Sequence, residues 1–308
     1  MGSLQQLVRK YPGVQLATLV ETPPEGEDWL HEVKFDGYRL LGYVSEGEVR
    51  LRTRNGKDWT EKFPGVAAAM RGLKATDAVV DMEAVVLDEK GRSRFQALQA
   101  ALGTEDVVGF AFDLLHLDGD DLTGLALLER KARLARLLRK GRLQYSDHVL
   151  GNGRKLFGES CRLGLEGIIS KAASAPYMAG RGRSWLKIKC GKRQEFVILG
   201  YSLARSGGRA LGALFLGYRK RGRLHYAGKV GTGFSMSGAA ELVGKFKPSD
   251  AVLQRDEMPA AEWKAIHWVK PELLCEVAFT EWTSDGRVRH PSFQGLREDK
   301  DAKEVVKE

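Results

Sequence analysis

The N-terminal third of the chain carries the pattern that most restricts its fold. Four short segments there are rich in β-branched residues, and glycine or polar turns separate each from the next. They lie around residues 30–35, 39–45, 48–54 and 78–88. Because strands that follow one another through turns usually pair as neighbours, the pattern predicts one antiparallel sheet.

Two helices are expected after these strands. In "LLERKARLARLLRK", leucines recur at helical intervals with basic residues between them, which predicts an amphipathic helix packed on the sheet. The leucines are Leu127, Leu134, Leu137 and Leu138. A second helix is expected through "GRKLFGESCRLGL".

From about residue 192 the chain changes to short strand-like segments, with one helix expected near 238–246. The segments are "EFVILGYSLA", "ALGALFLGYR", "RLHYAGKV" and "ELLCEVAFTEWT". This arrangement predicts a small closed barrel of the oligonucleotide-binding type. The expected fold class is therefore α+β, with domains at 1–190 and 191–308 and a short hinge near 190–193.

Charge and cysteine usage limit the class of protein. A net charge of +9 suits a polyanionic partner such as nucleic acid. Cys161, Cys190 and Cys275 are odd in number and far apart, so we expect neither a C-x-x-C zinc pair nor a disulfide framework, and a reducing cytoplasm as the setting. The start has no apolar signal core, and no apolar run approaches the length of a membrane span.

The stretch "HEVKFDGYRL" places Lys34 between Glu32 and Asp36. If side chains alternate along a strand here, Lys34 shares a face with Glu32 and points away from Val33 and Phe35. A lysine amine can act as a nucleophile only when it is neutral, and its ordinary pKa is about 10.4. We therefore expect a neighbouring cation or a partly desolvated pocket that favours the free amine.

Lys34, Asp36, Gly37 and Arg39 form a K-x-D-G-x-R pattern that resembles the nucleophile motif of the covalent nucleotidyltransferases, which are DNA ligases, RNA ligases and mRNA capping enzymes. Further matches follow in the family's order. They are Arg54 in "TRNGKD", Glu83 in "DMEAVV", Phe112 in "AFDLL", "EGIISK", "WLKIK" and "RHPSFQGLREDK". The resemblance spans essentially the whole chain and is nearest to the ligase module of the bacterial end-joining ligases, ligase D.

The resemblance implies a nucleotidyltransferase (adenylation) domain at 1–190 that transfers AMP from ATP to Lys34. It also implies that Glu32 reads the adenine, that Phe112 stacks on it, and that Arg39 and Arg54 approach the ribose and phosphate. From the residues alone, Phe112 in the apolar run "GFAFDLL" fits a plain core position equally well. Met82 stands where the family usually has glycine, which puts a tight backbone turn before Glu83 in question.

The remaining site residues are charged. Glu83 and Glu166 lie in apolar runs, where a carboxylate must be paired, protonated or bound to metal, so we expect both to hold Mg²⁺, with Mn²⁺ as an alternative. Three lysines are expected to supply positive charge to the triphosphate. They are Lys171, Lys187 and Lys189. For Lys187 and Lys189, a solvated basic strand is the alternative. Arg297 lies in an apparent charged surface turn with Asp299 and Lys300, and the resemblance implies that it orients the leaving pyrophosphate.

A ligase must seal any sequence, so we expect DNA contacts mostly through phosphates. The run "YRKRGR" is the first candidate for such contacts, and a solubilising loop is its alternative. Its basic residues are Arg219, Lys220, Arg221 and Arg223.

The expected activity is that of an ATP-dependent DNA ligase sealing 5′-phosphate/3′-hydroxyl nicks in nicked or broken duplex DNA. We expect a monomer in the bacterial cytoplasm at the nucleoid, with end-joining proteins as candidate partners. RNA sealing, GMP transfer and a non-catalytic nucleic-acid-binding module stay as alternatives. NAD use is disfavoured because 33 residues precede Lys34 and no four-cysteine zinc site is present. The sequence leaves open a stand-alone ligase or a fragment of ligase D.

Overall fold

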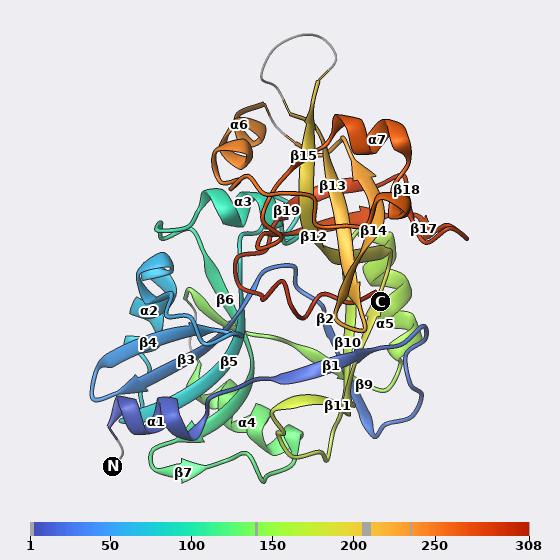
Figure 1. The fold of residues 1–308 in the computed structure, drawn as a ribbon. Coiled ribbons are helices and arrows are strands. Elements are labelled where there is room, and N and C mark those ends of the chain that lie inside the picture. The colour runs from blue at the N-terminus through green and yellow to red at the C-terminus, as the bar shows by residue number, and fades with distance from the viewer. Residues whose placement is uncertain (1–2, 139–140, 205–210, 235, 308) are drawn as a thin grey trace. The chain divides into compact units, whose positions relative to one another are not determined.

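The computed structural model describes residues 3–138, 141–204, 211–234 and 236–307 (Figure 1). The chain divides into two compact units, Met1–Cys190 and Gly191–Glu308. None of the helices within these described ranges reaches the length and hydropathy needed to cross a membrane.

The first sheet of unit 1 has the order β4-β3-β5-β6-β7, and β8 adds to β6. Its strands are β3 (Tyr38–Ser45), β4 (Glu48–Thr53), β5 (Asp77–Val85), β6 (Val108–Leu117), β7 (Asp120–Asp121) and β8 (Leu143–Tyr145). All neighbours pair antiparallel except β6 and β8, which are parallel. The antiparallel pairing predicted for the segments at 39–45, 48–54 and 78–88 is confirmed.

The second sheet of unit 1 has the order β1-β11-β10-β2-β9. Its strands are β1 (Gln15–Leu19), β2 (Trp29–Val33), β9 (His148–Leu150), β10 (Gly167–Ala172) and β11 (Gly180–Lys189). The prediction that segment 30–35 joins the same sheet as the next three strands was wrong, because β2 pairs with β10 and β9. Gly37 has no positive φ and so makes no tight hairpin turn. The chain instead passes β5 so closely that a Cβ on Gly37 would lie 2.2 Å from the Ala84 oxygen.

Both predicted helices of unit 1 are present. The helices are α1 (Leu4–Lys10), η1 (Thr60–Lys62), α2 (Pro64–Arg71), α3 (Phe95–Ala100), α4 (Leu127–Leu137) and α5 (Gly153–Arg162). Helix α4 packs on β6, and α5 packs against β10 and β2. The amphipathic leucine pattern therefore placed α4 on a sheet as expected.

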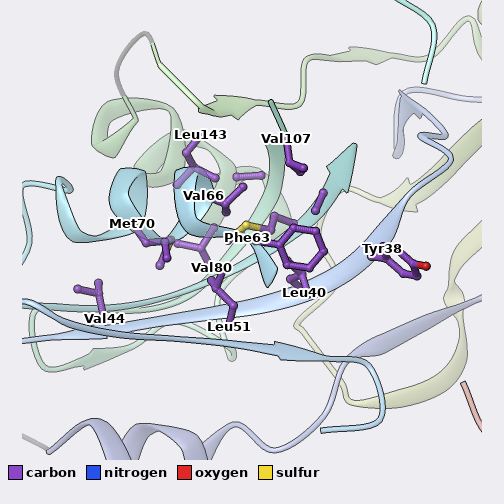
Figure 2. Close-up of a cluster of buried hydrophobic side chains, with 14 of the residues drawn as sticks. Tyr38, Leu40, Val44, Leu51, Phe63, Val66, Met70, Val80, Val107 and Leu143 are labelled. Atoms are coloured by element: carbon purple, nitrogen blue, oxygen red, sulfur yellow. The ribbon is translucent and has the colours of Figure 1, made fainter. Parts of the chain in front are cut away.

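A buried apolar cluster lies between the first sheet and the helices that cover one of its faces. Figure 2 shows part of it, with labels on Tyr38, Leu40, Val44, Leu51, Phe63, Val66, Met70, Val80, Val107 and Leu143. Met82 belongs to this cluster, and its backbone is extended strand rather than a tight turn. A Cβ on Gly42 would lie 2.7 Å from Met82 Cε, and one on Gly109 would lie 3.1 Å from its Sδ. The two flanking strands therefore carry glycines where the methionine needs room.

Unit 2 is built on a sheet of order β14-β13-β12-β16-β19, with β15 paired to β12. Its elements are β12 (Lys192–Leu203), β13 (Leu211–Lys220), β14 (Arg223–Val230), α6 (Met236–Gly244), η2 (Arg255–Glu257), α7 (Ala260–Ala265), β15 (His267–Trp268), β16 (Leu274–Phe279), β17 (Glu281–Trp282), β18 (Val288–Arg289) and β19 (Ser292–Leu296). The Phe293 N–H on β19 donates to the Thr232 carbonyl just after β14, 2.9 Å away. This unit is the predicted oligonucleotide-binding barrel.

The cysteines depart from the sequence prediction. Cys161 on α5 and Cys190 after β11 form a disulfide, with their Cα atoms 5.1 Å apart. The prediction that these cysteines do not pair was wrong, because the fold brings together two residues that lie 29 positions apart. Cys275 is a buried free thiol.

Candidate active site

Lys34 lies at the point where the chain leaves one sheet for the other. Strand β2 ends at Val33, and the Lys34 N–H still donates to the Gly167 carbonyl on β10, 2.9 Å away. Lys34 therefore follows the strand directly instead of lying inside it. Four residues, Lys34 to Gly37, connect β2 to β3, so the predicted nucleophile motif is a crossover between the two sheets.

Gly167 allows the strands to approach one another beside Lys34. Its φ is +148°, and a Cβ there would lie 2.0 Å from the Ile188 carbonyl oxygen on β11. A side chain at this position would collide with backbone, so only glycine fits. This close approach sets the place of Glu166, the preceding residue, relative to Lys34.

Lys34 is held by a carboxylate. Its Nζ lies 2.5 Å from Glu166 Oε2, and Glu166 is buried. Burial by itself lowers the pKa of Lys34, but the carboxylates of Glu166, Glu83 and Asp36 outweigh it and raise that pKa above its ordinary value. Burial therefore acts toward the free amine, as expected for a desolvated pocket, whereas the three carboxylates act against it. A cation that neutralises these carboxylates would work in the opposite direction.

Glu83 and Glu166 fit one mode of Mg²⁺ binding. Both carboxylates act electrostatically on Lys34, so the two acids lie near one amine. The described part of the chain contains no group of three or more His, Cys, Asp or Glu that could hold a metal ion. Mg²⁺ commonly uses one or two carboxylates with waters and substrate phosphates, and two acids near one lysine amine suit that coordination.

Arg39 is anchored by an acid that sequence reasoning missed. Its Nε and Nη2 donate to Asp81 at 2.8 and 2.6 Å, and the Tyr177 hydroxyl donates to the same carboxylate at 2.6 Å. Burial lowers the pKa of Arg39, but Asp81 outweighs that effect and raises it. The guanidinium also lies over the rings of Phe112 and Trp185, 4.8 and 5.2 Å from their centroids. Asp81 lies two residues before Glu83, on the same face of β5.

Glu32 is buried between two lysines. Its Oε1 lies 2.5 Å from Lys131 Nζ, and its Oε2 lies 2.7 Å from Lys171 Nζ. Burial raises the pKa of Glu32, but the two ammonium groups outweigh it and lower that pKa. Burial lowers the pKa of Lys171 to about 8. Lys171 lies beside Glu32 and over the rings of Phe112 and Trp185, and its role at the triphosphate stays a prediction.

Lys131 is a second residue that sequence reasoning missed. It lies four residues after Leu127 and three before Leu134, which places it on the buried face of α4. A lysine within the apolar stripe of a helix was a usable signal, because burying an ammonium requires a partner.

Phe112 packs as a core residue. Its ring makes an edge contact with Trp185, with centroids 5.9 Å apart, and it belongs to a buried cluster that includes residues of α1. Phe112 is therefore packed as the alternative prediction, a plain core position, describes. Stacking on adenine stays a prediction.

The pairing of neighbouring strands determines the positions of Lys187, Lys189 and Arg54. Lys187 pairs with Ile169 and Lys189 with Gly167, so both lie on β11 beside β10, the strand that carries Lys171 and directly follows Glu166. Both lysines are half-buried rather than fully solvated. Arg54 directly follows Thr53, which pairs with Leu40, so the ladder brings Arg54 beside Arg39.

Arg297 in unit 2 is buried, which corrects the prediction of a surface turn. Its Nε and Nη2 each donate to Asp299 at 3.0 Å, and Nη1 donates to Glu276 at 3.3 Å. Lys300 pairs with Glu195. Arg297 can be buried because the carboxylates of Asp299 and Glu276 pair with its guanidinium inside the unit. A role for Arg297 at the pyrophosphate stays a prediction, and it requires the guanidinium to exchange Asp299 and Glu276 for phosphate oxygens.

The basic run at 219–223 forms the hairpin turn between β13 and β14. Arg221 and Gly222 have φ of 51° and 79°, as a two-residue hairpin turn requires. Arg219 is half-buried and donates to the carbonyls of Ala302 and Gly222, both at 3.1 Å, so it holds the C-terminal segment. Lys220, Arg221 and Arg223 are exposed.

Comparison with known families agrees with this geometry. Residues 5–189 match the family model described as the ATP dependent DNA ligase domain, and residues 207–300 match the ATP dependent DNA ligase C terminal region. The chain belongs to the ATP-dependent DNA ligases. ATP use and the oligonucleotide-binding barrel after the catalytic domain are therefore established features of this ligase.

The ligase is similar to the ligase module of LigD proteins. It is 44% identical over 307 residues to the multifunctional non-homologous end joining protein LigD of Pseudomonas aeruginosa, covering 96% of this chain and 36% of that protein. It is 40% identical over 293 residues to LigD of Mycobacterium tuberculosis, covering 92% of this chain and 38% of that protein. A solved structure of mycobacterial DNA ligase D complexed with ATP and MES is 37% identical to this chain, with a TM-score of 0.73. The match covers 96% of this chain and 98% of that one. The chain thus spans about 36 to 38% of the length of these full-length relatives.

Proposed function

We propose that the ligase seals 5′-phosphate/3′-hydroxyl nicks in duplex DNA through a covalent AMP on Lys34. The observation that supports this most strongly is the Lys34 amine held 2.5 Å from Glu166 at the crossover between two sheets. An amine in that place, near two acids suited to Mg²⁺, is arranged for attack on a phosphate.

The proposed reaction has three displacements at phosphorus. Lys34 Nζ forms a bond to the α-phosphorus of ATP, loses a proton, and pyrophosphate leaves. The 5′-phosphate of the nick then displaces Lys34 from the AMP, and the 3′-hydroxyl displaces AMP to form the phosphodiester. Each step needs alignment and charge stabilisation more than new functional groups, so one site can serve all three.

The surrounding residues divide the substrate between them. We assign Glu32 to the adenine, Arg39 and Arg54 to the ribose and phosphate, and the half-buried Lys187 and Lys189 to the triphosphate. Glu83 and Glu166 would hold Mg²⁺, or Mn²⁺, which when bound supplies Lewis-acid charge to phosphate oxygens. Neutralising those carboxylates also removes the main influence that raises the pKa of Lys34.

The biological setting is proposed from the relatives. The named LigD proteins are non-homologous end joining proteins. For this ligase we propose the same pathway, action as a monomer on broken or nicked DNA at the bacterial nucleoid, and contact with end-joining proteins.

The test is to incubate the protein with Mg²⁺ and α-labelled ATP, GTP or NAD, then denature it and look for bound label. We expect label from ATP alone, and its loss on a chase with nicked DNA but not with nicked RNA. Absence of label from all three nucleotides would contradict the proposed chemistry. Transfer to nicked RNA alone would assign the alternative, an RNA ligase.

The exposed hairpin residues should contribute to DNA affinity. Replacing Lys220, Arg221 and Arg223 together by glutamine is expected to weaken binding to nicked duplex and to lower the slope of log Kobs against log salt by about 2 to 3, because each lost phosphate contact removes about 0.9. Fluorescence anisotropy at several salt concentrations measures both. The control removes the same charge from exposed lysines elsewhere, and an equal loss of slope there would contradict the assignment. The control lysines are Lys74, Lys90 and Lys155.

A further inference from the structure

The starting observation is a buried ammonium that charge balance does not explain. Lys131 is 1% exposed, and its partner Glu32 is 2% exposed. Lys171, also 1% exposed, already supplies one positive charge to Glu32. A second ammonium adds desolvation cost and repels Lys171, which contributes to the lowered pKa of Lys171. Lys131 must therefore contribute something other than neutralisation.

What Lys131 adds is direction. Its Nζ donates to Glu32 Oε1 at 2.5 Å and to the Ser146 carbonyl at 3.0 Å. Lys171 Nζ lies 2.7 Å from Glu32 Oε2, and within the described residues no hydrogen bond ties this ammonium to a second acceptor. Lys131 instead links the Glu32 carboxylate to a backbone carbonyl, which gives the carboxylate a fixed reference for its orientation.

Lys131 is itself rigidly placed. The neighbouring Arg130 donates twice to Asp113 on β6, at 2.7 and 2.9 Å, and both side chains are fully buried. Leu134, one turn further along α4, is also fully buried. The helix therefore cannot shift on the sheet without breaking a bidentate ion pair, and Lys131 reaches Glu32 from a fixed position.

We propose that Lys131 is a positioning residue for base selection, holding the Glu32 carboxylate in the orientation that accepts a hydrogen bond from the 6-amino group of adenine. This inference rests on the proposed function, in which Lys34 attacks ATP and Glu32 reads the base. An ionised carboxylate is an acceptor only. It therefore fits an amino group at position 6 and rejects the oxygen that guanine carries there.

The test compares two nucleotides and two proteins. The probes are ATP and purine riboside triphosphate, which lacks the 6-amino group, and the readout is kcat/KM for covalent attachment, followed by the mass of the intact protein. We expect wild type to prefer ATP by about 10-fold or more, the value of one hydrogen bond to a charged group. Lys131→Met should bring the preference to within about 3-fold of unity. The loss should come from a higher KM for ATP, with attachment of the analogue little changed.

Three further variants separate positioning from stability. Lys131→Gln is a second uncharged variant with a polar end for the buried site, and the same loss of preference is expected. Lys131→Arg, which keeps the charge and donors, should restore most of it. Leu134→Ala loosens the same helix face without touching Glu32 and should keep the full preference for ATP. Thermal unfolding of each variant reports its stability.

The outcomes are distinct. Three results would overturn the inference while AMP attachment itself proceeds. The first is an undiminished preference for ATP in both Lys131→Met and Lys131→Gln. The others are a loss of preference in Leu134→Ala equal to that in Lys131→Met, and an absence of preference in wild type. Absence of any attachment in wild type would overturn the proposed function, and the inference with it.

Discussion

Replacing Lys34 by arginine is expected to lower covalent AMP attachment by at least about 10³-fold, because removal of a covalent nucleophile is among the largest single losses in catalysis. The guanidinium keeps a positive charge opposite Glu166, but it stays protonated and so cannot attack phosphorus. Labelled ATP and denaturing electrophoresis measure the attachment. The fold should be preserved because the ion pair with Glu166 can still form.

The same variant should still perform the last step. Attack of the 3′-hydroxyl on a nick that already carries AMP does not use Lys34 as a nucleophile, so Lys34→Arg should seal a pre-adenylylated nick within about 10-fold of wild type. Lys155→Arg, at an exposed position, is the matched control for both assays. Undiminished attachment in Lys34→Arg would show that the nucleophile lies elsewhere.

The elements of this fold were largely readable from local patterns, but their partners were not. The segment at 39–45 and its neighbours were predicted as an antiparallel sheet, and β3, β4 and β5 form one. Alternation of side chains says that a segment is a strand, yet it does not say which sheet the strand joins. Strand β2 enters a different sheet because Gly37 continues past β5 instead of turning back.

The candidate site shows the same division. Glu32, Lys34, Arg39 and the two acids Glu83 and Glu166 could be proposed from residue type, motif and spacing. The residues that hold them could not, because Lys131 is 99 positions from Glu32 and Tyr177 is 96 from Asp81. Sequence spacing carries no signal across such separations unless a charged residue interrupts an apolar stripe.

Two corrections come from charge and proximity that only the fold reveals. Arg297 had the appearance of a surface residue because its neighbours are charged, but Asp299 and Glu276 are the partners that allow it to be buried. Cys161 and Cys190 do not form a recognisable spacing, and they pair because the end of α5 lies beside the end of β11. Both cases depend on which segments are neighbours in space.

Glu166→Gln is expected to slow AMP attachment to Lys34 by about 10² to 10³-fold, the range for loss of a group that stabilises charge at a reacting centre. The substitution removes the acceptor that holds Lys34 Nζ at 2.5 Å and one of the two proposed Mg²⁺ ligands. The apparent Mg²⁺ concentration for half-maximal attachment should rise. Single-turnover labelling over a Mg²⁺ titration measures both quantities.

One physical effect of this substitution acts in the opposite direction. Glu166 is the carboxylate that most raises the pKa of Lys34, so its loss frees the amine and by itself would speed attachment. We expect slower attachment because the loss of Lys34 positioning and of Mg²⁺ binding outweighs the gain in the fraction of free amine. Glu159→Gln, on the exposed face of α5, is the matched control and should leave the rate unchanged. Attachment in Glu166→Gln at or above the wild-type rate at every Mg²⁺ concentration would show that Glu166 chiefly keeps Lys34 protonated and is not a metal ligand.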